Sequence, residues 1–353
     1  MKFFKKKKPY QTTLIYVAAF VIIIAGLMAA QKVIIPILIA LFISIVCAYP
    51  VMWMQKKGLP NGIAILIMLT GILVMFFGFG GIVGNSLSNF SQEAPKYEAR
   101  LKDSLSGLIK RLNEMGISAG SGELLNALDP GKVLNFTALA MTEIGALMSE
   151  SFLILLIAIF ILSELKSFWV KAAIIEKAQG FSLAYLDEIG QSIRHYLSIK
   201  TLISVITGIL IMVWLMIIGV DYPILWGLIA FLLNYIPNIG SIIAAVPTML
   251  LAMVQLGMVG VIWTAVGYFA VNVIMGNVIE PKVMGKGLGL STLVVFLSLI
   301  VWGFVFGTVG MFLSVPLTMS IKIILATNEK TKWIAIMLGT EENATAILEG
   351  YKK

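Results

Sequence analysis

Charged residues are scarce in this chain. Of its 353 residues, 12% are Asp, Glu, Lys or Arg and 59% are hydrophobic, whereas soluble domains carry about twice that share of charge. This composition excludes an ordinary soluble domain. It predicts an all-α, polytopic integral membrane protein, with the lipid bilayer as its main partner and no nucleic acid bound.

Cysteine and histidine are nearly absent, which restricts the possible chemistry. The single cysteine, Cys47, excludes an intramolecular disulfide. The single histidine, His195, has no nucleophile indicated near it, so the sequence gives no sign of a Ser–His catalytic arrangement. A nucleotide-binding P-loop needs glycine five residues before its Gly-Lys pair, and Glu280 occupies that place before Gly285-Lys286. We therefore expect no enzyme activity, no cofactor or metal, and no direct drive by ATP.

Long apolar runs predict the membrane-spanning helices, which need about 20 residues each. These runs cover residues 14–30, 33–54, 62–83, 152–165, 201–220 and 258–275. Two longer apolar stretches, 223–255 and 292–326, are interrupted by proline and glycine. We predict that these two form broken or re-entrant hairpins.

The alternation of apolar and charged segments divides the chain into six parts. They are three membrane helices (1–84), a charged helical insertion (85–150), a fourth membrane helix (151–165), surface helices (166–200), a membrane core with two broken hairpins (201–327) and a tail (328–353). If the N-terminus lies in the cytoplasm, most of the 26 Lys and Arg residues face the cytoplasm, as membrane proteins prefer. The insertion then faces outward, and the surface helices and the tail are cytoplasmic.

Polar and helix-breaking residues are clustered within the stretch 223–255. They are Asn234, Pro237, Asn238, Gly240 and Ser241. Proline cannot donate a backbone hydrogen bond, and the Asn and Ser side chains can bond backbone groups that are freed nearby. A break at membrane depth is tolerated where it is buried in protein or lines a watery cavity, and transporters bind their substrates at such breaks. The alternative is an ordinary turn between two spans at the membrane surface.

Two late segments resemble each other weakly. Ile239-Gly240 is followed by Val246-Pro247, and Val309-Gly310 is followed by Val315-Pro316. In the predicted topology the first hairpin opens from outside and the second from inside. Oppositely oriented broken hairpins are typical of alternating-access transporters, which makes Gly310 and Pro316 candidates for a second gate. The alternative is coincidence in a sequence rich in Gly and Val.

The C-terminal half carries specific motifs. They are Tyr-Ile-Pro-Asn-Ile-Gly at 235–240, Glu280-Pro281 with the following residues to Ser291, and Trp302-Gly303 with Val309-Gly310-Met311. With these motifs and its general layout, the chain resembles the autoinducer-2 exporter family of bacterial permeases. The match is closest to the members named for exporting the quorum-sensing signal autoinducer-2, although the family name does not fix the substrate. The resemblance implies about eight spans, a bacterial inner-membrane location with both termini cytoplasmic and homo-oligomeric assembly. Other members are described as sodium or lithium/proton antiporters.

Two amides and two acids complete the candidate site residues. Asn272 and Asn277 lie in or at the end of the sixth span, and their amides suit a small polyhydroxylated ligand because they both donate and accept hydrogen bonds. Their alternative role is helix–helix hydrogen bonding. Glu280 either carries a proton or cation, or pairs with Lys282 and Lys286 at the surface. Asp221 has the same two possibilities on the opposite side.

Three functional hypotheses follow. The first is a secondary transporter or facilitator that exports a small polar signalling molecule similar to autoinducer-2. The second is a sodium (lithium)/proton antiporter in which Glu280 or Asp221 binds the coupling ion, Na⁺ or H⁺. The third is a membrane scaffold that does not transport and binds a partner through residues 85–150.

Overall fold

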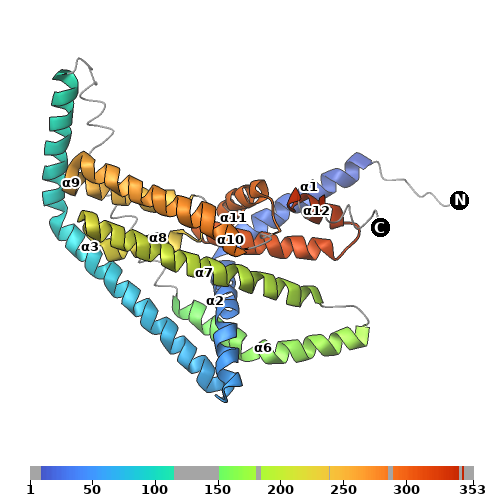
Figure 1. Cartoon of the computed structure of the whole chain (residues 1–353). Helices are drawn as coiled ribbons and strands as arrows, with labels where there is room; N and C mark the ends of the chain where they lie inside the picture. The colour runs from blue at the N-terminus through green and yellow to red at the C-terminus, as the bar shows by residue number, and fades with distance from the viewer. Residues whose placement is uncertain are drawn as a thin grey trace.

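The computed structural model describes residues 9–114, 151–179, 184–237, 239–284, 289–341 and 344–345. These residues form helices without any strand, so the predicted all-α class is confirmed. Figure 1 shows the helices in chain order. They are α1 (Pro9–Ala29), α2 (Gln31–Lys56), α3 (Asn61–Glu114), α6 (Ser151–Gln179), α7 (Ala184–Ile218), α8 (Pro223–Leu233), α9 (Gly240–Asn272), the π-helix η1 (Val273–Ile279), α10 (Glu280–Met284), α11 (Thr292–Ala326) and α12 (Lys332–Met337).

Within the described ranges, 5 helices are long and apolar enough to cross a membrane, or 6 if the bent pair in α6 counts as one span. That pair, Phe152–Leu165 and Ser167–Ala178, is bent by 50°. A polytopic membrane protein is thus supported, and the expected count of about eight spans is not confirmed. The boundaries predicted at residues 84 and 200 both fall inside continuous helices, α3 and α7.

The helix α9 is a hairpin that reverses at Gly257. Thr248 and Tyr268 share a hydrogen bond of 3.0 Å between their hydroxyls, although 20 residues of straight helix would separate them by about 30 Å. Gly257 has φ 67° and ψ −158°, a backbone conformation that glycine adopts without steric cost. Two helical arms therefore lie side by side, one on each side of this turn.

The helix α11 is a second hairpin, and it reverses at Gly307. Trp302 Nε1 donates a 3.0 Å hydrogen bond to Thr318 Oγ1 across 16 residues, a separation of about 24 Å in a straight helix. Gly307 has φ 62° and ψ −145°, nearly the conformation of Gly257. The hairpin predicted over residues 292–326 is therefore present, with its reversal at Gly307. The reversal at Gly257 falls outside the other predicted hairpin, 223–255, and joins its second half to the predicted sixth span.

The helix α7 packs against α2, α8, α9 and α11. Its closest approach is to α8, where a Cβ on Gly208 would lie 2.7 Å from the Gly227 carbonyl oxygen, and a Cβ on Gly227 would lie 2.7 Å from that of Gly208. The two backbones can meet only because both residues lack side chains. The large cluster of buried apolar residues around Trp226 and Leu251 holds α8 and the first arm of α9 in place.

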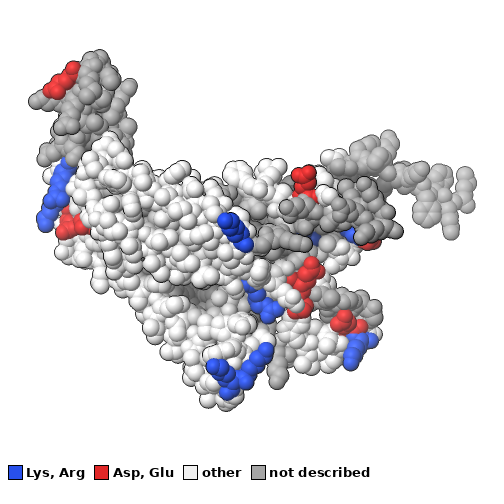
Figure 2. All heavy atoms as spheres, viewed as in Figure 1, with Lys and Arg blue, Asp and Glu red and all other residues white. Residues whose placement is uncertain are grey.

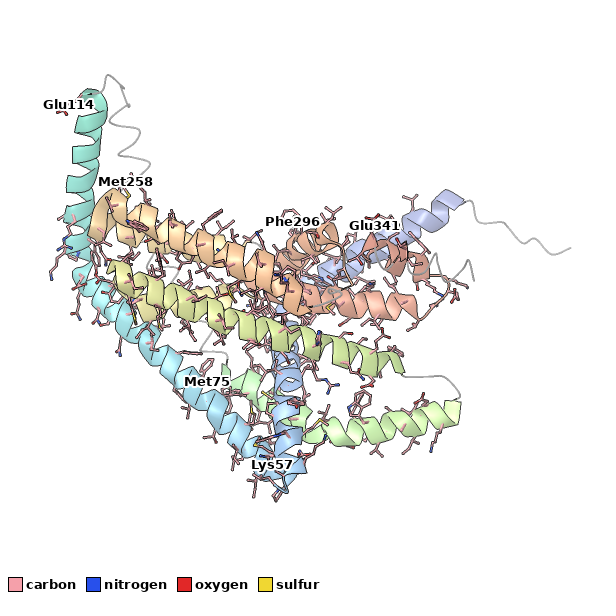
Figure 3. The ribbon with its side chains drawn as sticks, viewed as in Figure 1. Lys57, Met75, Glu114, Met258, Phe296 and Glu341 are labelled. Carbon is pink, nitrogen blue, oxygen red and sulfur yellow. The ribbon has the colours of Figure 1, made fainter. Side chains whose placement is uncertain are left out.

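The surface fits a lipid environment. Large apolar side chains such as Phe77, Phe269 and Phe304 are at least 70% exposed, and the broad face seen in Figure 2 carries its charged groups mainly toward its edges. Figure 3 places Met258 at the Gly257 turn and Glu114 at the far end of α3, beyond the other helices. The predicted insertion is described only as far as Glu114, and the rest of it lies outside the described residues.

Candidate functional site

The predicted break forms the tip between α8 and α9, and it lies against α7. Asn234 Nδ2 donates to Ser204 Oγ at 2.9 Å, and Tyr235 Oη donates to Thr201 Oγ1 at 2.7 Å. Asn234 is half-buried and Tyr235 is buried. The tip therefore packs against α7 through these two side chains, and we call residues 234–239 the first break.

The other predicted residues of the first break have separate roles. Pro237 is half-buried and its carbonyl accepts a 2.7 Å bond from the Ile239 N–H. A Cβ on Gly240 would lie 1.8 Å from the Leu233 carbonyl oxygen, so only glycine fits where α9 begins. Ser241 is half-buried in the first turn of α9, and Asn238 lies outside the described residues.

A buried polar stripe runs along α7 toward the first break. Lys200, Ser204 and Thr207 lie at i, i+4 and i+7, which places them on one helix face, and each is at most 3% exposed. Thr201 lies beside this stripe and accepts the Tyr235 hydrogen bond. Buried polar side chains among membrane helices are costly and concentrate at functional sites.

The second hairpin meets the first break through aromatic rings. The Tyr235 and Phe312 ring centroids are 4.6 Å apart, and Phe42 of α2 lies 5.2 Å from Phe312 and 6.4 Å from Tyr235. Phe312 stands between Gly310 and Pro316, both of which are buried in the second arm of α11. The two predicted breaks therefore touch, and we call Phe42, Tyr235 and Phe312 the aromatic contact.

The structure also shows a second similarity between the two hairpins, at the turns where they reverse. The residues Gly257-Met258-Val259-Gly260 and Gly307-Thr308-Val309-Gly310 stand at the two reversals. A Cβ on Gly260 would lie 2.9 Å from the carbonyl oxygen eight residues earlier, and a Cβ on Gly310 would lie 1.9 Å from the corresponding oxygen. Gly310 thus has its geometric counterpart in Gly260 as well as its weak sequence counterpart in Gly240.

Glu280 is held in an ion pair with α7. Lys200 Nζ lies 2.7 Å from Glu280 Oε1 and 2.9 Å from Oε2, with the two side chains 4% and 19% exposed. Lys282, one expected partner, is exposed on α10, and Lys286 lies outside the described residues. The acid is therefore turned toward the protein interior, beside the end of the polar stripe.

The two amides of the sixth span are not brought to the first break. Asn272 is half-buried at the end of α9 and Asn277 is exposed on η1. Neither side chain lies among the contacts that join α7, the first break and α11. Their assignment as ligand-binding residues stays a prediction.

Asp221 belongs to a different cluster, between α3, the α7–α8 turn and the first arm of α9. Tyr97 Oη lies 2.6 Å from Glu93 Oε2 and 3.0 Å from Asp221 Oδ2, and Gln255 Nε2 donates to the same Asp221 oxygen. Burial, together with the hydrogen bond to Glu93, raises the pKa of the Tyr97 phenol. A phenol has one hydrogen, so Glu93 and Asp221 compete for it or share it in a three-centre hydrogen bond.

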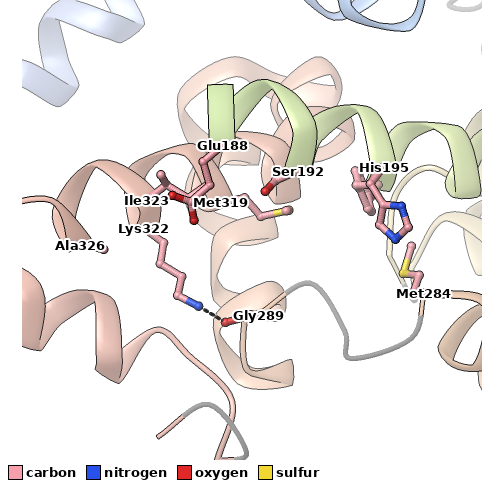
Figure 4. A pocket seen from close by; sticks show the side chains of 10 residues that line it. Glu188, Ser192, His195, Met284, Gly289, Met319, Lys322, Ile323 and Ala326 are labelled. Carbon is pink, nitrogen blue, oxygen red and sulfur yellow. Dashed lines mark hydrogen bonds between the residues drawn. The ribbon is translucent and has the colours of Figure 1, made fainter. Parts of the chain in front are cut away.

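A cavity of about 290 Å³ lies between α7, α10 and α11. Figure 4 shows Glu188, Ser192 and His195 along α7 with Lys322 of α11 opposite, where Lys322 Nζ donates to the Gly289 carbonyl. Tyr196 also lines this cavity and lies one helical turn before Lys200 on α7. The cavity is near the lower end of the size range of small-molecule sites.

The fold and the site together define a class of protein, a helical membrane transporter with broken hairpins. A model of the family described as AI-2E family transporter matches residues 17–330, and the chain belongs to this family. It is 38% identical over 338 residues to a putative transport protein of Haemophilus influenzae, covering 94% of this chain and 97% of that one.

Two relatives from Escherichia coli K12 are similar over nearly their whole length. The chain is 36% identical to the AI-2 transport protein TqsA over 324 residues, covering 92% of this chain and 94% of TqsA. It is 35% identical to the putative transport protein YhhT over 326 residues, covering 92% and 93%. These relatives support membrane transport, and they confirm the resemblance seen in the motifs.

The sequence prediction missed the residues on α7. Lys200, Thr201 and Ser204 lie at the boundary between a charged segment and an apolar run, and this change of composition predicts a domain boundary there. Their signal was the helical spacing of Lys200, Ser204 and Thr207. Phe312 gave no local signal, because its role depends on contact with the first break.

Proposed function

We propose that this protein exports a small polar solute similar to autoinducer-2 by alternating access at the aromatic contact. The observation that carries the proposal is the meeting of Tyr235 and Phe312 at 4.6 Å, because it joins the first break to the hairpin α11 beside a buried polar stripe. The name of the relative TqsA supports autoinducer-2 as the solute.

In this mechanism the first break and the second arm of α11 move apart. The aromatic contact opens, and the Ser204 hydroxyl and the Asn234 amide become available to hydroxyl groups of the solute. Such groups both donate and accept, so they bind a polyol without carrying a charge across the membrane. The Gly257 and Gly307 turns allow each hairpin to move as a unit on α7.

A sodium (lithium)/proton antiporter is the second candidate. It is supported by the inward-facing Glu280 and by the Tyr97 cluster, where Glu93 and Asp221 compete for one phenol hydrogen. The scaffold hypothesis rests on residues 85–150, of which the structure describes only the end of α3. No contact of the described part favours it.

A proteoliposome assay tests the proposal directly. Purified protein is reconstituted with autoinducer-2 on one side, and movement is measured with no ion gradient, a proton gradient or a sodium gradient. Movement of the signal without a gradient, lost in protein-free vesicles, is the expected result. Movement of protons or sodium ions without the signal would overturn it in favour of the antiporter.

A further inference from the structure

The Lys200–Glu280 pair differs from the other ion pairs that the structure describes. Lys171–Glu164 and Lys332–Glu329 have side chains that are 64% and 61%, and 38% and 85%, exposed. The Lys200 side chain is 4% exposed, and its ammonium contacts both carboxylate oxygens of Glu280. The Lys200–Glu280 pair therefore brings two charges together among apolar helices.

Stability does not explain such a pair. Removing two charges from water costs as much as or more than their mutual attraction returns, so apolar residues of similar volume hold helices together equally well. Intramembrane ionisable residues instead mark ion and substrate pathways. The pair also lies at one end of the polar stripe, four residues before Ser204 on α7.

The backbone before Glu280 is suited to binding a cation. The π-helix η1 (Val273–Ile279) ends there, and the Glu280 N–H donates to the Met275 carbonyl, five residues earlier. π-helical segments are rare and often occur at functional sites. Pro281 follows and has no N–H, so the next carbonyl in this pattern, that of Gly276, loses its helical donor. Backbone carbonyls freed from helical hydrogen bonds coordinate Na⁺ in transporters.

We propose that Glu280 forms a monovalent-cation site whose occupant in this protein is the chain's own Lys200 ammonium. The ammonium contacts both carboxylate oxygens. A bound Na⁺ would occupy the same position, where the carboxylate would neutralise its charge. A tethered cation replaces a free coupling ion, so the wild-type protein requires no sodium. The inference concerns how the proposed transport is driven, but its test is a binding measurement that does not depend on transport of any solute.

The test compares melting temperatures of purified protein in NaCl and in choline chloride at equal ionic strength. Wild type should melt at the same temperature in both salts. Lys200→Met, which empties the site, should show a saturable rise in NaCl only, and the double variant Lys200→Met/Glu280→Gln should lose that rise. Lys171→Met removes a lysine from an exposed pair and is the matched control, for which no sodium effect is expected.

Two results would overturn the proposal. One is a saturable sodium effect in wild type, because the site would then already accept a free ion. The other is equal melting of Lys200→Met in both salts. If Lys200→Met cannot be purified, Lys200→Gln removes the charge and keeps a donor toward the carboxylate, and the same two outcomes decide. Loss of autoinducer-2 movement with the sodium pattern intact would refute the proposed function alone.

Discussion

The hydroxyl of Tyr235 joins the first break to α7, so its removal should change how readily the gate opens. Tyr235→Phe keeps the ring on Phe312 and deletes only the 2.7 Å bond to Thr201. A hydrogen bond between membrane helices contributes about 0.6 kcal/mol on average and about 1.7 kcal/mol at most. If the bond exists only in the closed arrangement, its loss raises the open fraction about threefold, and at most about 18-fold.

The assay is autoinducer-2 efflux from proteoliposomes, expressed per mole of protein. Tyr235→Phe should increase the initial rate about threefold if opening limits transport, and Thr201→Val should give the same increase. The double variant should be no faster than either single variant, because both remove one bond. Tyr268→Phe is the matched control, since its hydroxyl partner, Thr248, lies in the same hairpin and moves with it. A wild-type rate for Tyr235→Phe, or additive effects with Thr201→Val, would refute the reasoning.

Three further predictions concern stability, measured by thermal unfolding in detergent. Gly257→Ala places a side chain at φ 67° and should cost about 1–2 kcal/mol, whereas Gly62→Ala, with open space around it, should be nearly neutral; equal effects would contradict the reversal. Gly227→Ala puts a Cβ 2.7 Å from a carbonyl oxygen of α7 and should cost about 1–3 kcal/mol, and an unchanged melting temperature would contradict that packing. Because its pKa is raised in the fold, Tyr97 stabilises the protein below about pH 10 and this contribution is lost as pH rises further. Tyr97→Phe should therefore reduce the loss of stability between neutral and strongly alkaline pH, and an unchanged pH profile would count against the cluster.

Local features of this fold could be predicted from the sequence. Pro237, Gly240 and the neighbouring Asn residues break a helix by their own chemistry, so the first break was placed correctly. The all-α class followed equally directly. A segment that crosses the lipid must satisfy its backbone hydrogen bonds internally, and an α-helix does so. The confirmed family followed from motifs in the C-terminal half.

Contacts between distant segments could not be predicted. Lys200 and Glu280 are separated by 80 residues. Lys282 and Lys286 lie much nearer to Glu280 in the sequence and were therefore its expected partners. A single glycine in an apolar helix is often tolerated without a turn, so Gly257 gave no sign that α9 reverses. Composition alone does not determine the number of spans, because an apolar hairpin and a continuous apolar helix have the same composition.

The central claim is that the first break and α11 separate during transport. Cysteines at positions 235 and 312, in a protein with Cys47 replaced by Ala, should be joined by a short thiol cross-linker, because the native rings lie 4.6 Å apart. Autoinducer-2 efflux from proteoliposomes should stop on cross-linking and return after reduction, while each single cysteine variant stays active with the reagent. Undiminished efflux from fully cross-linked protein would contradict the account.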